Sequence, residues 1–225
     1  MKMEAAALVP AYNEAGTIAD VVGGLLPFVS QVVVVDDGST DGTGDRARAS
    51  GANVLAHATN RGKGHAVRTG LVHLLSGSST HIVFLDGDLQ HLPRETPRLL
   101  DAARTTGADV VIGERRFDPE RMPAARYHAN RIGSRALSWF VGVPIRDTQC
   151  GFRVFRADAL RRMALTARGY EVETEMLVKL RRLGGRITSV PVTAVYDGQR
   201  SKLRPIRDTT RTCFLAVYYR FLQRL

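Results

Sequence analysis

The sequence predicts an α/β protein built on a doubly wound, mostly parallel β-sheet. Short runs rich in valine and isoleucine, typical of strands buried on both faces, alternate along the chain with stretches of helical periodicity. Connections between parallel strands of one sheet are almost always right-handed, so the alternation places helices on both faces of the sheet. No internal repeat, low-complexity tract or linker interrupts the pattern, and we expect one domain over residues 1–225.

Most of the expected strands lie in the first half of the chain. They are residues 5–9, 31–35, 53–57, 81–85 and 109–112. The helices expected between them are residues 16–26, 40–50, 62–75 and about 94–105. Pro27 and Gly51 follow the first two helices, and both residue types end helices.

The pattern becomes less regular beyond residue 115. The elements expected there are a polar loop at 117–126, a helix at 127–140, a dense polar motif at 146–155, a helix at 172–183, a strand at 187–195 and a helix at 206–225. The last helix is amphipathic and has arginines near both ends. It either packs on the core or lies in a membrane interface with its arginines on anionic headgroups.

The composition is that of an ordinary globular protein with an unusual charge. Of 225 residues, 44% are hydrophobic and 24% charged, which excludes disorder and a coiled coil, and no apolar stretch approaches the length of a membrane-spanning helix. Two cysteines, Cys150 and Cys213, are too few for a disulfide framework and favour a cytoplasmic location. The net charge is +10, and residues 181–225 hold ten lysines and arginines against two acids. This excess predicts a polyanionic partner, which is nucleic acid, anionic lipid or a phosphorylated small molecule.

Acidic residues closely follow three of the expected strands. They are Glu14, the pair Asp36 and Asp37, and the triplet Asp86-Gly87-Asp88. Ligands of doubly wound sheets bind outside the carboxyl ends of the strands, so we expect these acids at one edge, where a cation must offset their repulsion. Two carboxylates separated by one glycine can bind a hard divalent ion such as Mg²⁺ together with substrate phosphates.

Two other polar segments allow both a structural and a functional interpretation. Residues 36–43 can form the end of a strand and the N-cap of a helix, but this interpretation does not explain the adjacent Asp36 and Asp37. A role in accepting hydrogen bonds from a base or a ribose explains them. The segment NRGKGH at 60–65 opens the third expected helix but lacks the spacing of a P-loop. Its glycines permit close packing and a helix start, while Lys63 brings a positive charge near the acids.

Seven motifs in order resemble those of glycosyltransferase family 2, in particular the dolichyl- or polyprenyl-phosphate mannose and glucose synthases. They are PAYNE, VVDDGSTDGT, NRGKGHAVRTG, FLDGDLQHLP, GERRF, DTQCGFRVF and EVETEML, and the resemblance covers about residues 5–205. It implies the GT-A fold, with a Rossmann-like half for nucleotide sugar and metal at about 1–115, an acceptor half at about 116–205 and a basic amphipathic helix at 206–225. It also implies inverting transfer of a hexose from a GDP-mannose or UDP-glucose type of donor to a polyprenyl phosphate.

The resemblance assigns roles to individual residues. The nucleotide sugar would contact Pro10, Tyr12, Glu14, Val35, Asp37, Lys63, Asp86, Gly87, Asp88 and Lys202. Mg²⁺ or Mn²⁺ would be bound by Asp86, Asp88 and Gln90. The acceptor phosphate would contact Arg131, Ser134 and Arg153. The catalytic residues would be Asp147, Arg131 and Arg115 or its neighbour Arg116.

The acceptor decides whether the reaction needs a general base. A hydroxyl must lose its proton, and Asp147 is the candidate base; a phosphate monoester, with a second pKa of about 6, is already anionic and needs arginines instead. The arginine surplus fits a phosphate better. Cys150 stands where the family often has serine, and we expect it to be buried and inert. His91, beside Gln90, could approach the metal.

Two other functions stay open at this point. A transferase of the same family could act on a soluble phosphorylated or hydroxylated metabolite, which the lack of transmembrane helices favours and the basic, aromatic tail opposes. A nucleic-acid-binding module is suggested by the pI of about 10.3 alone, and the acidic cluster opposes it. We expect a cytoplasmic enzyme that can be peripheral on the cytoplasmic face of the membrane, with no nucleic-acid partner.

Overall fold

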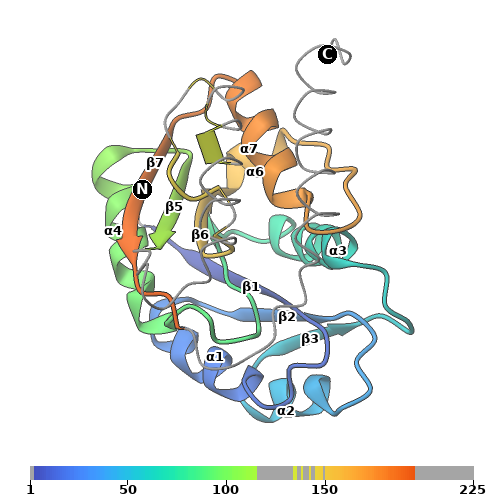
Figure 1. The fold of residues 1–225 in the computed structure, drawn as a ribbon. Coiled ribbons are helices and arrows are strands. Elements are labelled where there is room, and N and C mark those ends of the chain that lie inside the picture. The colour runs from blue at the N-terminus through green and yellow to red at the C-terminus, as the bar shows by residue number, and fades with distance from the viewer. Residues whose placement is uncertain are drawn as a thin grey trace.

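A central sheet organises the computed structural model, which describes residues 3–115, 134–135, 138, 142, 145–148 and 150–195. Within this part of the chain, seven strands form one sheet in the order β3-β2-β1-β4-β6-β5-β7 (Figure 1). The strands are β1 (Ala5–Ala11), β2 (Val32–Asp36), β3 (Asn53–Ala56), β4 (His81–Phe84), β5 (Val110–Arg115), β6 (Arg153–Arg156) and β7 (Ile187–Val192). All six strands expected in this region are present, and β6 is an additional one.

The helices of the described residues also follow the expected order. They are α1 (Ile18–Leu25), α2 (Thr43–Ala49), α3 (Lys63–Leu75), α4 (Thr96–Thr106), α6 (Ala157–Arg161) and α7 (Val172–Arg182). Pro27 lies in a short 3₁₀ helix (Leu26–Phe28) that extends α1, and a second 3₁₀ helix (Pro93–Glu95) precedes α4. Figure 1 shows α1 and α2 together on one side of β1 and β2, and α3 on the other, as the doubly wound prediction requires.

Packing of α3 on the sheet depends on Gly70. A Cβ atom at this position would collide with the side chains of Leu8 and Val35, both of which are fully buried. The glycine therefore lets the helix backbone lie close to β1 and β2. Val35, which we expected against the donor base, is instead a core residue beneath α3.

Strand polarity brings the functional motifs to one edge. β1, β2 and β4 are parallel, with Ala11 beside Asp36 and Leu8 beside Phe84. β6 is antiparallel to both β4 and β5, so its first residue, Arg153, lies beside Phe84 at the same edge. Insertion of β6 thus delivers the described residues of the segment before it, 145–148 and 150–152, to the carboxyl ends of β4 and β5.

Several expected elements lie outside the described residues. They are the loop at 117–126, most of the helix at 127–140 and the whole helix at 206–225. Within the part of the chain that is described, no helix combines the length and the apolar character needed to cross a bilayer.

Candidate functional site

The acidic segments meet at the carboxyl edge of the sheet. Tyr12 and Glu14 follow β1, the pair Asp36 and Asp37 lies at the end of β2, and Asp86 and Asp88 follow β4. The loop after β4 is tied to the start of α1, because the hydroxyl of Thr17 donates to the carbonyl of Gly87 at 2.6 Å. This grouping is what the strand order predicts for a doubly wound sheet.

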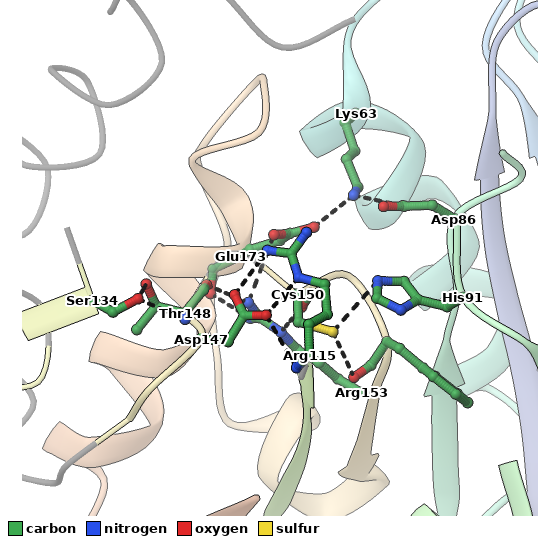
Figure 2. A network of polar contacts seen from close by, with 11 residues as sticks. Lys63, Asp86, His91, Arg115, Ser134, Asp147, Thr148, Cys150, Arg153 and Glu173 are labelled. Atoms are coloured by element: carbon green, nitrogen blue, oxygen red, sulfur yellow. Dashed lines mark hydrogen bonds and ion pairs between the residues drawn. The ribbon is translucent and has the colours of Figure 1, made fainter. Parts of the chain in front are cut away.

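A lysine lies between two carboxylates at the centre of this edge (Figure 2). Lys63 Nζ is 2.5 Å from Asp86 Oδ1 and 2.5 Å from Glu173 Oε1. Burial opposes the charge of the lysine, but the two carboxylates raise the pKa of Lys63 above its ordinary value. Burial also favours the neutral acid at Asp86, yet Lys63 keeps the pKa of that carboxyl below its ordinary value. Lys63 and Asp86 are therefore both charged at neutral pH.

Asp88 is held in a less favourable environment. Burial, followed by the charge of Asp86 and that of Glu14, raises its pKa to about 6, although the backbone N–H of Gln90 donates to its Oδ1 at 3.1 Å. A second cation would relieve the repulsion between Asp86 and Asp88. Among the described residues no cluster of three or more His, Cys, Asp and Glu side chains is arranged for a metal. Two carboxylates completed by substrate oxygens are, however, the donor set that Mg²⁺ prefers, so the residues fit this ion.

Arg115, at the end of β5, forms a bidentate pair with Asp147. Its Nε lies 2.5 Å from Oδ2 and its Nη2 lies 2.8 Å from Oδ1. The Asp147 side chain is fully buried. Burial would raise the pKa of Asp147, but the guanidinium of Arg115 lowers it below the ordinary value. This geometry joins the end of β5 to the segment before β6.

Arg153, the first residue of β6, is another buried cation. Its Nε donates to the carbonyl of Cys150 at 2.8 Å, its Nη2 to that of Thr148 at 2.7 Å and its Nη1 to that of Glu173 at 2.8 Å. All three guanidinium nitrogens therefore have backbone acceptors. The side chain fixes the segment before β6 relative to the first turn of α7.

His91 and Cys150 form a contact behind the charged groups (Figure 2). Cys150 Sγ lies 3.5 Å from His91 Nε2, and both residues are buried. Burial, with a further contribution from Arg115, lowers the pKa of His91 to about 4, so the imidazole is neutral at pH 7. Burial and the charge of Asp147 raise the pKa of Cys150 to about 12, which makes its thiol unreactive in the folded protein.

Comparisons with known proteins define the family. The model of "Glycosyl transferase family 2" matches residues 6–164. The chain belongs to glycosyltransferase family 2. It is 38% identical over 218 residues to glycosyltransferase AglJ of Haloferax volcanii. This alignment covers 95% of this chain and 70% of that protein. It is 37% identical over 206 residues to the undecaprenyl-phosphate mannosyltransferase of Micrococcus luteus, with 86% and 84% of the two chains covered.

Solved structures agree with this membership. Glucosyl-3-phosphoglycerate synthase from Mycobacterium tuberculosis, in complex with Mn²⁺, UDP and glucosyl-3-phosphoglycerate, matches with a TM-score of 0.77 and 26% identity. The match covers 97% of this chain and 80% of that one. The family 2 glycosyltransferase described here thus has the GT-A fold that the motifs implied, and it is an enzyme.

Several residues to which the motifs gave ligand contacts have internal partners in this glycosyltransferase. Asp37 accepts from the backbone N–H groups of Arg61 and Gly62 at 3.0 and 2.8 Å and lies 2.6 Å from His57 Nδ1. Asp36 accepts from the backbone N–H of Ser39 at 2.9 Å. This corrects our argument that only a nucleoside explains the two adjacent acids, because both of them fix loops at the edge.

The residues expected on the acceptor side also have internal partners. Asp147, the candidate general base for a hydroxyl acceptor, is buried and paired with Arg115. Arg153 and Ser134 are each only 2% exposed, and Ser134 Oγ lies 3.2 Å from Thr148 Oγ1. Both side chains hydrogen-bond to the segment before β6, and their contact with an acceptor phosphate stays a prediction.

The glycine-rich segment 60–65 has the structural role that we expected. Gly62 has a φ of +95°, and a Cβ atom at Gly62 or Gly64 would collide with the backbone of residues 167–168. The N–H of Gly64 donates to the carbonyl of Arg168 at 2.9 Å. The start of α3, including Lys63, is thereby fixed against the segment that leads to α7.

Sequence reasoning missed two acids of α7. The motif EVETEML was recognised, but no role was given to Glu173, which pairs with Lys63, or to Glu175. Glu175 is fully buried and accepts from the N–H of Thr166 at 2.9 Å and that of Ala167 at 2.8 Å. One signal was present for Glu175: an acid surrounded in the sequence by residues that pack into the core is unusual unless it has partners.

The remaining candidates lie in known places or outside the described part. Pro10 lines a cavity of about 20 Å³ next to Lys63, Asp86 and Glu173. Tyr12 is 37% exposed. Gly87 is buried against the side chains of Ala11, Glu14 and Ile18. Arg116, Arg131 and Lys202 lie outside the described residues.

Proposed function

We propose that this glycosyltransferase moves a hexose from a nucleotide-diphosphate sugar to a polyprenyl phosphate with the help of Mg²⁺ or Mn²⁺. The donor side rests on one observation, the meeting of Asp86, Asp88 and Lys63 at the carboxyl edge of the sheet. The acceptor class is supported by the relative from M. luteus, whose name is undecaprenyl-phosphate mannosyltransferase.

The donor diphosphate would lie over the loop after β4. Asp86, Asp88 and Gln90 would hold the metal ion, which would offset the charge that develops on the departing β-phosphate. Lys63 contributes a further positive charge from the start of α3. Tyr12 is exposed at the end of β1, where its ring can contact the nucleoside.

The transfer step forms one bond and breaks one. An oxygen of the acceptor phosphate attacks the anomeric carbon while the bond from this carbon to the β-phosphate oxygen breaks, and the electron pair leaves with the nucleoside diphosphate. A phosphate monoester is mostly dianionic at pH 7 and needs no general base. The pairing of Asp147 with Arg115 supports such an acceptor, because it leaves this carboxylate in a structural role. In-line attack inverts the anomeric centre, so an α-linked donor gives a β-linked product.

The acceptor phosphate needs cations that reach it. We propose Arg131 and Lys202 for this role, in line with their motifs, and Arg115 as a charge at the end of β5. The excess of basic residues over 181–225 suits contact with an anionic membrane surface, from which a polyprenyl phosphate would be taken. The enzyme would then act at the cytoplasmic face of the membrane.

A soluble phosphorylated acceptor is the second candidate. It is favoured by the similarity to glucosyl-3-phosphoglycerate synthase, which was crystallised with glucosyl-3-phosphoglycerate. Both candidates use a phosphate-bearing acceptor and the same donor site, but they differ in the attacking oxygen. It belongs to the phosphate of a polyprenyl phosphate and to a hydroxyl of a soluble metabolite such as 3-phosphoglycerate, which would need a general base.

One assay separates these possibilities. The purified enzyme is incubated with GDP-mannose or UDP-glucose, with Mn²⁺ or Mg²⁺, and with a short polyprenyl phosphate, 3-phosphoglycerate or no acceptor. We expect metal-dependent release of nucleoside diphosphate together with an organic-soluble sugar phosphate only with the polyprenyl acceptor. Transfer to 3-phosphoglycerate alone would support the second candidate, and full transfer in excess EDTA would refute the proposed metal dependence.

A further inference from the structure

Lys63 is shared between two carboxylates that come from distant parts of the chain. Asp86 follows β4, while Glu173 lies in the first turn of α7. Both oxygens are 2.5 Å from the ammonium, and the side chains of Lys63, Asp86 and Glu173 are 12%, 30% and 16% exposed. The ammonium also lies 5.6 Å from the centre of the Tyr170 ring. The formal charges of one lysine and two carboxylates sum to −1, which suits a site where a metal ion is expected.

The two carboxylates differ in how firmly they are held. The backbone of Glu173 is fixed by Arg153, whose Nη1 donates to its carbonyl at 2.8 Å and whose Nη2 lies 3.6 Å from its Oε2. Asp86, in contrast, lies in the loop that is expected to bind the cation. An incoming cation must therefore compete with Lys63 for Asp86, whereas Glu173 keeps its position.

We propose that Glu173 is a positioning residue that retains Lys63 when the lysine gives up Asp86. Before a divalent ion binds, the ammonium of Lys63 offsets the charge of Asp86. When a divalent ion and a nucleoside diphosphate enter, Lys63 stays on Glu173 and its ammonium turns toward the diphosphate. This inference rests on the proposed function, since it concerns the same donor site.

Burial explains why the second carboxylate is needed. An ammonium that loses its partner in a largely buried site is strongly disfavoured, so a cation could not easily displace Lys63 from Asp86 if Glu173 were absent. A cavity of about 20 Å³ adjoins the cluster, lined in part by Pro10, Val67 and Met176. It offers room for about one water molecule, and hence for a shift of the lysine side chain.

Binding of Mn²⁺ to the nucleotide-free enzyme, followed by the paramagnetic signal of free Mn²⁺, tests this inference. Lys63→Met removes the competing ammonium, and we expect Mn²⁺ to bind about tenfold more tightly. With GDP or UDP present, we expect Lys63→Met to bind Mn²⁺ more weakly than the wild type, because the variant lacks the charge that contacts the diphosphate. Mn²⁺ binding that is unchanged or weaker without nucleotide would overturn the proposal.

A double-mutant cycle separates positioning from a general field effect. Glu173→Gln should weaken nucleotide-free Mn²⁺ binding in the wild-type background and have little effect in the Lys63→Met background, because Glu173 acts through the lysine. Equal effects in both backgrounds would mean that Glu173 contributes only its charge, and would refute the inference. Asp158→Asn, an exposed acid paired with Arg161 on α6, is the matched control and should change nothing.

Two further variants keep the outcome decisive. Asp86→Asn should abolish Mn²⁺ binding with and without nucleotide; if it does not, the proposed metal site is wrong, whatever Lys63 does. Thermal melting of every variant verifies folding. Should Lys63→Met fail to fold, Lys63→Gln replaces it in the cycle, and unchanged Mn²⁺ affinity in Glu173→Gln would still contradict the inference.

Discussion

Replacement of Glu175 by glutamine is expected to destabilise the fold strongly, because four described donors converge on its buried carboxylate. They are the N–H and hydroxyl of Thr166, the N–H of Ala167 and the ammonium of Lys179, all within 3.0 Å. Glutamine has nearly the same shape but turns one acceptor oxygen into an NH₂ group. At least one of the N–H groups of residues 166 and 167 then faces this NH₂ group and loses its acceptor.

The magnitude follows from these contacts. An unsatisfied buried N–H costs about 1–3 kcal/mol, and the weaker bond to Lys179 about 1 kcal/mol more. We therefore expect a loss of about 2–4 kcal/mol, or roughly 5–15 °C in Tm for a chain of this size. The effect should extend to the site, since residues 167–168 pack against Gly64 beside Lys63.

Urea unfolding followed by far-UV circular dichroism measures the free energy of unfolding. Asp158→Asn, whose side chain is 78% exposed, is the control and should change it by less than about 0.5 kcal/mol. A change that small for Glu175→Gln would refute the reasoning, because the carboxylate would then not hold the 166–167 segment. A reduced m-value would instead point to altered denatured or native compactness.

Three other predictions follow from the site. Asp88→Asn should lower sugar transfer at least about 100-fold, because it removes a proposed metal ligand. It should leave stability unchanged or slightly higher, because Asp86 repels the carboxylate that is removed. Undiminished transfer would refute the role of Asp88 in metal binding. Asp147→Asn should cost about 3–5 kcal/mol in urea unfolding, since it leaves Arg115 without its buried partner. The pKa of Asp147 is depressed below its ordinary 3.8, so the stability that this carboxylate contributes is fully present above that value and is lost as the pH falls through the folded-state pKa. The wild type should therefore lose more stability on acidification than Asp147→Asn. Parallel pH profiles of the two proteins would contradict this. Cys150 should resist iodoacetamide at pH 8 until the protein unfolds, as its pKa is about 12, and rapid labelling mapped to this residue by mass spectrometry would show that the site is open.

The sequence predicts the parallel part of the sheet well because its strands contain short apolar runs, such as VVVV in β2 and IVF in β4. β6 was missed for a physical reason: only Val154 and Phe155 are apolar, and Arg153 and Arg156 flank them. What makes Arg153 compatible with a buried strand is a set of carbonyl acceptors, including that of Glu173 20 residues away. Local patterns do not contain such long-range partners.

The same limit explains which site contacts a single sequence can predict. Asp86, Asp88 and Lys63 follow from strand ends and from the need for a countercharge, both of which are local. Asp37 also follows a strand directly, and Asp147 lies in a dense polar motif, yet their partners are 25 and 32 residues away. A single sequence does not distinguish a carboxylate that faces a ligand from one that faces such an internal partner.

Crystals grown with Mn²⁺ and GDP or UDP test the account most directly, through the anomalous signal of manganese. We predict one strong peak within bonding distance of Asp86 or Asp88 and of the diphosphate oxygens. Nucleotide bound with no peak there, or manganese held elsewhere, would contradict the assignment of this edge of the sheet as the donor site.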